Sequence, residues 1–144
     1  MSQLFDVIAA DGKDRNPNDG VEMEWETRIH NEEKYLEVIT TGAADKEGSL
    51  NMAKVIKETM QRHRITRALI DHRGVESVSG EIIEIYDRPK LFKIMGFVLG
   101  VRIAEIIKPE HVKHFSFFET VCVNQGFSFS IFRERLPALE WLLK

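Results

Sequence analysis

Apolar residues change their spacing along this chain, from every second residue near the start to helical spacing further on, and this limits the fold to strands mixed with helices. From Val21 to His30, apolar residues and a threonine alternate with charged ones, which is typical of a strand with one wet face. Residues 35–41 are rich in β-branched side chains, so we predict an antiparallel return strand that ends at Gly42.

Helical spacing begins at residue 49. Ser49 is the predicted N-cap of a helix over residues 49–64, and basic residues in its last turn suit the helix dipole. The short apolar run Ala68–Ile70 then predicts a strand that is buried on both faces and ends at Asp71.

The rest of the chain repeats this alternation. We predict helices over 79–88, with a break at Pro89, and over 90–96, 110–125 and 137–143, and strands over 101–107 and 127–131. Pro109 suits the start of the third of these helices and Gly126 its end. The predicted fold class is α/β, with a mixed five-stranded sheet that opens with an antiparallel hairpin, continues with parallel strands and is covered by four to five helices.

Length and composition favour one domain. The chain has 144 residues, and residues 1–20 include a polar stretch rich in turn formers, so we expect a flexible lead-in followed by a single domain over 21–144. The net charge of −3 and the scattered basic residues disfavour nucleic acid as a partner.

Cysteine and apolar content indicate the compartment. Cys122 is the single cysteine, which fits a reducing compartment, and we expect a cytoplasmic protein. The longest apolar run, residues 94–101, is too short for a transmembrane segment, which needs about twenty residues.

The residues that follow Ile70 are the first candidate site, because ligands of open α/β sheets favour the carboxyl ends of strands. Asp71 either acts as a general base beside His72 or accepts backbone N–H bonds from a turn that it starts. Arg73 either binds an anion together with the helix start at residue 79 or is a solvated surface arginine.

Several motifs resemble a known family. The run Ala68–Asp71, then Gly74-Val75, then Ser77-Val78-Ser79-Gly80 before a helix is similar to the corresponding turn of STAS domains, the anti-sigma-factor-antagonist family. In regulatory members a serine or threonine at this helix start is phosphorylated by a partner kinase, and Ser79 matches that position. Val78 stands where the regulatory motif has an acidic residue.

A closer resemblance is to small bacterial STAS-like (SpoIIAA-like) proteins that are grouped with CRAL-TRIO-type lipid-binding folds. It covers the chain from about Met23 to Leu143 and implies an α/β STAS-like fold without established enzymatic residues. The motifs that carry it are Leu69-Ile70-Asp71, Tyr86-Asp87-Arg88-Pro89, Arg102-Ile103-Ala104, Phe117-Phe118-Glu119, Asn124-Gln125-Gly126, Ile131-Phe132 and Ala138-Leu139-Glu140-Trp141-Leu142.

Other chemistry finds less support. Glu110, His111 and His114 lie at a helix start, where the two histidines could share a metal, but no third and fourth ligand is apparent, so we predict no metal site. We predict that Cys122 is a buried small hydrophobe. Phosphate-loop, dinucleotide-binding and nucleophile-elbow motifs are absent from the sequence, and we predict no cofactor.

The leading hypothesis is a non-enzymatic binding or regulatory module that acts through protein contacts. Its candidate binding residues are Asp71, His72, Arg73, Ser77, Ser79, Tyr86, Phe92 and Phe97. The apolar run 91–100 forms either a core helix and loop or, with Tyr86, a hydrophobic pocket or self-association patch. The alternatives are a carrier of a lipid or other small apolar ligand, and an enzyme centred on residues 71–73. A homodimer is compatible with each.

Overall fold

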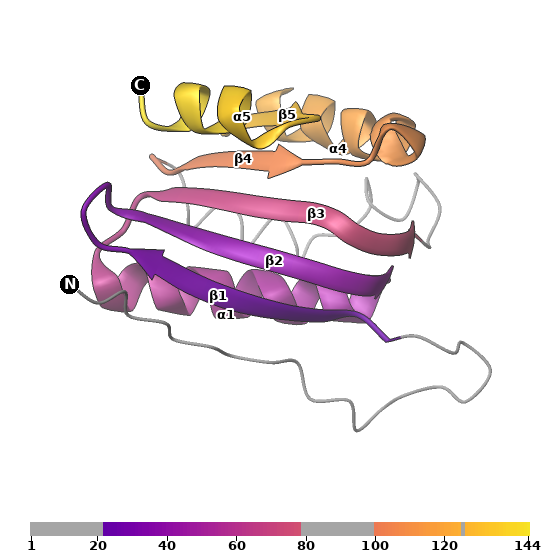
Figure 1. Cartoon of the computed structure of the whole chain (residues 1–144), viewed down its shortest axis with the longest axis horizontal. Helices are drawn as coiled ribbons and strands as arrows, with labels where there is room; N and C mark the ends of the chain where they lie inside the picture. The colour runs from indigo at the N-terminus through magenta and orange to yellow at the C-terminus, as the bar shows by residue number, and fades with distance from the viewer. Residues whose placement is uncertain (1–21, 79–99, 125) are drawn as a thin grey trace.

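A computed structural model describes residues 22–78, 100–124 and 126–144. These residues form a sheet with helices on both sides (Figure 1). The strands are β1 (Glu24–His30), β2 (Tyr35–Ala44), β3 (Arg67–Val78), β4 (Arg102–Ile106) and β5 (Ser128–Phe132). The helices are α1 (Lys46–His63), the 3-10 turn η2 (Pro109–His111), α4 (Val112–Asn124) and α5 (Arg135–Leu142).

The sheet has five strands in the order β1-β2-β3-β4-β5. β1 and β2 pair antiparallel, whereas β2–β3, β3–β4 and β4–β5 pair in parallel. The predicted hairpin and the parallel strands after it are therefore confirmed. Within the described ranges three α-helices accompany the sheet, fewer than the four to five predicted; the predicted helices over 79–88 and 90–96 lie outside these ranges.

The two faces of the sheet differ in their cover. Helices α1 and α4 pack on one face, here called the covered face, where Leu50 and Ala53 of α1 share an apolar cluster with Phe118 and Cys122 of α4. Helix α5 packs on the opposite face, where Ala138 and Leu142 meet the apolar side chains of β3 and β4.

The rest of that opposite face carries no described helix. In Figure 1 it is the side of β1 and β2 that faces the viewer, with α1 behind the sheet and α5 to one side. We call this surface the open face. Side chains alternate along a strand, so each strand presents one row of residues to the covered face and one row to the open face.

Helix α1 begins earlier than predicted. Asp45, not Ser49, is its N-cap, and the Asp45 carboxylate accepts a 2.6 Å hydrogen bond from the Gly48 N–H. Aspartate caps a helix as well as serine does, and this cap adds a turn before the apolar periodicity starts. Helix α5 likewise begins at Arg135 and not at Pro137, since proline is tolerated within a first turn.

β3 is much longer than predicted, because the strand that we expected to end at Asp71 runs from Arg67 to Val78. It continues to Val78 because β2 extends to Ala44 and supplies a parallel partner along the whole length, with register shifts where the pairing passes Thr41–Gly74 and Ala43–Ser77. Pairing with a neighbouring strand thus overrides the local turn propensity of the Asp-His-Arg-Gly segment.

Gly74 marks the first of these shifts and is required there by a close approach of two strands. A Cβ atom at this position would lie 2.6 Å from the Thr40 carbonyl oxygen and 2.9 Å from the Thr41 Cγ2 atom.

Gly74→Ala is expected to lower the free energy of unfolding by about 1–3 kcal/mol, because backbone must move to relieve the overlap. Urea unfolding checks this, with Gly126→Ala as a contrast: a Cβ there meets nothing within 4 Å but carries the strain of a φ of +89°. Wild-type stability in Gly74→Ala would contradict the close approach.

Helix α4 ends as predicted. Gly126 has a φ of 89°, and the N–H groups of Gly126 and Phe127 donate to the carbonyls of Val123 and Cys122, which is the pattern of a Schellman cap. No helix in the described parts of the chain is long and apolar enough to cross a membrane.

Candidate functional site

The structure divides the predicted site at residues 71–73 between the two faces of the sheet. These residues lie inside β3 and not beyond its carboxyl end, so their side chains alternate. His72 is buried on the covered face, whereas Asp71 and Arg73 pair with each other on the open face. The prediction of one convergent site at a strand end was therefore wrong.

Asp71 and Arg73 form a tight pair. The Arg73 Nε and Nη2 atoms donate to the two Asp71 carboxylate oxygens at 3.0 and 2.8 Å, and the Arg73 backbone N–H donates to Oδ1 at 3.0 Å. Burial raises the pKa of Asp71, but these hydrogen bonds outweigh it and hold the pKa below its ordinary value. Asp71 thus accepts one backbone N–H bond, but it does so within β3 and not from a turn that it starts.

His72 is held by a separate buried network. Its Nδ1 atom lies 2.7 Å from the Thr40 Oγ1, its Nε2 atom lies 3.5 Å from a Glu105 carboxylate oxygen, and its ring stacks on Phe115 of α4. The Thr40 hydroxyl also lies 3.2 Å from the Asp71 carbonyl oxygen, to which it can donate. No local sequence pattern indicates this network, because its members come from three strands and a helix.

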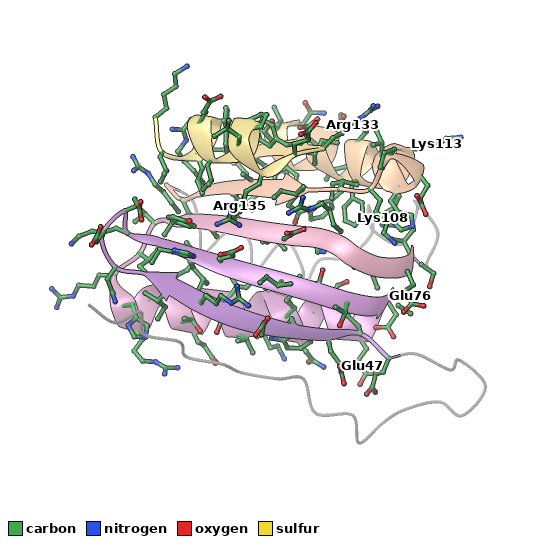
Figure 2. All side chains as sticks on the ribbon, viewed as in Figure 1. Glu47, Glu76, Lys108, Lys113, Arg133 and Arg135 are labelled. Carbon is green, nitrogen blue, oxygen red and sulfur yellow. The ribbon has the colours of Figure 1, made fainter. Side chains whose placement is uncertain are left out.

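A second open-face group, the Glu37 cluster, comprises His30, Tyr35, Glu37 and Arg135. Glu37 is only 4% exposed. Its carboxylate lies 2.7 Å from the His30 Nε2 and accepts from the Arg135 Nη1 at 2.5 Å and Nη2 at 3.4 Å. The rings of His30 and Tyr35 stack with their centroids 4.2 Å apart. Figure 2 shows Arg135 between α5 and β3.

Charge interactions join the two open-face groups. Burial raises the pKa of Glu37, but hydrogen bonds from Arg135 and His30 prevail and hold it below its ordinary value. Arg73 interacts electrostatically with Glu37, and Arg135 does so with Asp71. The open face therefore carries a continuous strip of paired charges that runs from β1 across β2 and β3 to the start of α5.

The lowered pKa values of Glu37 and Asp71 predict a loss of stability in acid. In the unfolded chain these groups titrate near about 4.3 and 3.9. Their contribution is complete above those values and is lost as the pH falls through the lower folded-state pKa values. Urea midpoints between pH 5 and pH 2 should fall steeply for the wild type and less steeply for Glu37→Gln. Equal slopes of the urea midpoint against pH for the two proteins would contradict the lowered pKa assigned to Glu37. Glu140→Gln, at an exposed site on α5, serves as the control.

The remaining predicted residues fall into two groups. Ser77 is exposed, one residue before the end of β3. Ser79, Tyr86, Phe92 and Phe97 lie outside the described residues. Cys122 is fully buried, as predicted, and burial together with the carboxylates of Glu105 and Glu119 raises the pKa of its thiol.

The two histidines near the start of α4 have different surroundings. His111 is buried in η2, and His114 packs edge-on against Phe115. Among the residues that the structure describes, no three histidine, cysteine or acidic side chains are grouped so that they could hold a metal ion.

Comparisons with known proteins bear on the fold. No protein-family model matches the sequence, and no curated protein matches it significantly. Among solved structures, the chain is similar to an uncharacterized protein from the DUF3478 family with a SpoIIAA-like fold from Shewanella loihica PV-4, at 19% sequence identity and a TM-score of 0.52 over 85% of this chain and 94% of that one. A likeness to the anti-sigma factor antagonist SpoIIAA in its unphosphorylated form has 10% identity and a TM-score of 0.45, over 71% and 98% of the two chains.

The described residues thus have a SpoIIAA-like fold. This confirms the STAS-like, SpoIIAA-like resemblance that the sequence motifs indicate, at the level of the fold.

Proposed function

We propose that this chain is a non-enzymatic binding module of SpoIIAA-like fold that docks a protein partner on its open face, around Arg73. The observation that carries the proposal is the state of this side chain. The Arg73 side chain is 46% exposed, yet two hydrogen bonds from its guanidinium to the Asp71 carboxylate fix it. An exposed arginine whose conformation is already restrained loses little entropy on binding, which is the property of an interface anchor.

The candidate catalytic groups are already paired or buried, and this supports a non-enzymatic role. Asp71 is neutralised by Arg73, His72 is buried against Thr40 and Phe115, and the Cys122 thiol is buried with a raised pKa. A general base or a nucleophile must reach the proton or atom on which it acts. These groups instead contact one another or the core.

Charge at one end of the sheet supports a protein partner over a small ligand. Figure 2 places Lys108 and Arg133 near the α4 side of the sheet and Glu47 and Glu76 across from them, near the ends of α1 and β3. A surface with positive and negative charges in separate places orients a partner whose charges have the complementary arrangement.

Affinity capture with charge reversal tests the proposal. Tagged wild-type chain and Arg73→Glu are incubated with extract of the native cells, and retained proteins are identified by mass spectrometry. We expect a discrete partner with the wild type, at least about tenfold less of it with Arg73→Glu, and an unchanged amount with Arg62→Glu, which reverses an exposed arginine at the end of α1. Equal capture by wild type and Arg73→Glu would refute the docking site.

Phosphorylation is the regulatory form of the same proposal. Ser77 is exposed beside the docking surface, and Ser79 matches the position that regulatory STAS domains modify. A phosphate would add about two negative charges near Arg73 and alter the docking surface. Incubation with candidate kinases followed by intact-mass analysis tests this, with Ser77→Ala and Ser79→Ala to locate the phosphate. An unchanged mass with every kinase would count against the switch.

The alternative is a carrier of a lipid or another small apolar ligand, for which Tyr86, Phe92 and Phe97 are the candidate contacts. Native mass spectrometry of freshly purified protein separates the two functions, since a carrier retains a ligand and a docking module does not.

We further propose residues 21–144 as the binding domain, with residues 1–20 as a lead-in. The single buried cysteine supports a cytoplasmic location.

A further inference from the structure

Two residues of β3, His72 and Arg73, lie opposite the single residue Thr40 of β2, at the first register shift between the strands. The flanking pairs are Ile39–Asp71 and Thr41–Gly74. Two residues against one is the arrangement of a β-bulge, which disrupts the ladder locally and changes the direction of a side chain. The direction of Arg73, around which docking is proposed, therefore depends on this bulge.

Thr40 contacts the bulge on both sides of Arg73. Its hydroxyl oxygen lies 3.2 Å from the Asp71 carbonyl oxygen and 2.7 Å from the His72 Nδ1. Its own carbonyl oxygen lies so close to Gly74 that a Cβ atom there would come within 2.6 Å of it. The two residues next to Arg73 in the chain are thus both held against Thr40.

The Thr40 hydroxyl makes both of its hydrogen bonds in one arrangement. It has a single proton, which it donates to the Asp71 carbonyl, and it then accepts from the His72 Nδ1–H. The other ring nitrogen, Nε2, faces Glu105 at 3.5 Å, and the ring stacks on Phe115. Thr40 and His72 are 0% and 3% exposed, so water does not compete for these hydrogen bonds.

The contacts of Arg73 depend on the same stretch of backbone. Its N–H donates to the Asp71 Oδ1 at 3.0 Å, and its guanidinium donates to both carboxylate oxygens. We propose that Thr40 is the positioning residue of Arg73: by binding Asp71 and His72 from the covered face, its hydroxyl holds the bulge that presents Arg73 on the open face. This inference rests on the proposed docking at Arg73 and adds to it a buried residue that a partner cannot touch.

Two substitutions of Thr40 separate the effect of its hydroxyl from that of its packing. Thr40→Val keeps the shape and removes the hydroxyl, whereas Thr40→Ser keeps the hydroxyl and removes a methyl group. Burial raises the pKa of Asp71, but hydrogen bonds from Arg73 hold it below its ordinary value, so NMR titration of the Asp71 carboxyl in the full chain reports on their geometry. We expect this pKa to rise toward its ordinary value in Thr40→Val and to stay lowered in Thr40→Ser.

Thr59→Val is the matched control. Thr59 is 1% exposed, and its hydroxyl has no hydrogen-bond partner among the residues that the structure describes, so the pKa of Asp71 should not change. Near-ultraviolet circular dichroism confirms that each variant is folded. An unchanged Asp71 pKa in Thr40→Val, or an equal rise in Thr40→Ser or Thr59→Val, would overturn the proposal.

Affinity capture from native cell extract connects the position of Arg73 with docking. Relative to the wild type, we expect Thr40→Val to retain at least about threefold less of the partner, the change in affinity that corresponds to the loss of one hydrogen bond. Thr40→Ser and Thr59→Val should retain as much as the wild type. A raised Asp71 pKa in Thr40→Val, together with equal capture by wild type and Arg73→Glu, would support the positioning and refute the docking. Full capture by Thr40→Val, where Arg73→Glu loses the partner, would refute the positioning.

Discussion

Glu37→Gln is expected to lower the free energy of unfolding by about 2–3 kcal/mol, the range for charged hydrogen bonds at a buried site. Both carboxylate oxygens of Glu37 accept hydrogen bonds, from His30 and from the two Nη atoms of Arg135. Glutamine keeps the shape but removes the charge and replaces one acceptor with a donor. The Arg135 guanidinium would then face an N–H group instead of an oxygen.

Glu105→Gln is the matched control, because Glu105 is buried to the same degree, at 5% exposed against 4% for Glu37. One Glu105 oxygen lies 3.5 Å from the His72 Nε2, and the other has no hydrogen-bond partner among the residues that the structure describes. Glutamine loses little at such a site, so we expect a change below about 1 kcal/mol. Urea unfolding at pH 7 compares Glu37→Gln with Glu105→Gln. Equal losses of the free energy of unfolding would contradict the role given to Arg135 and His30.

Leu142→Ala is expected to lower the free energy of unfolding by about 2–4 kcal/mol, the usual cost of a cavity at a fully buried leucine. Leu142 is inaccessible and packs with Leu69, Ala104 and Ile106 beneath α5. Because α5 also carries Arg135, loosening it should weaken the Glu37 cluster as well. Glu37→Gln and Leu142→Ala should therefore combine to less than the sum of their separate effects.

The same helix provides the control for this variant. Leu136 is 67% exposed, so Leu136→Ala removes the same atoms from a position that buries little, and we expect a change within about 0.5 kcal/mol. Thermal and urea unfolding of the two alanine variants compare them directly. Similar losses at both positions would show that α5 does not pack on the sheet through Leu142.

Sequence patterns predicted the elements whose signal is local. The alternation before His30 and the β-branched run after residue 35 gave the hairpin, and Gly126 gave the end of α4. In each case one short segment carries the information. The motif resemblance likewise indicated the SpoIIAA-like fold because its matches are spread over most of the chain.

The length of β3 and the arrangement of the site depend on partners far away in the sequence. Asp71–Gly74 has the composition of a turn, and only pairing with β2 makes it a strand. Arg135 meets Glu37 across 98 residues, which no local spacing reveals. Once β3 is extended, alternation separates His72 from Asp71 and Arg73, and the predicted site becomes two networks on opposite faces.

Docking at Arg73 is most directly tested by a photo-crosslinking amino acid placed at that position in the full-length chain and activated in native cell extract. We expect a discrete crosslinked partner from position 73, reduced by an excess of unlabelled wild-type chain, and no such product from position 62 at the end of α1. Absence of a crosslink from position 73, or the same product from both positions, would contradict it.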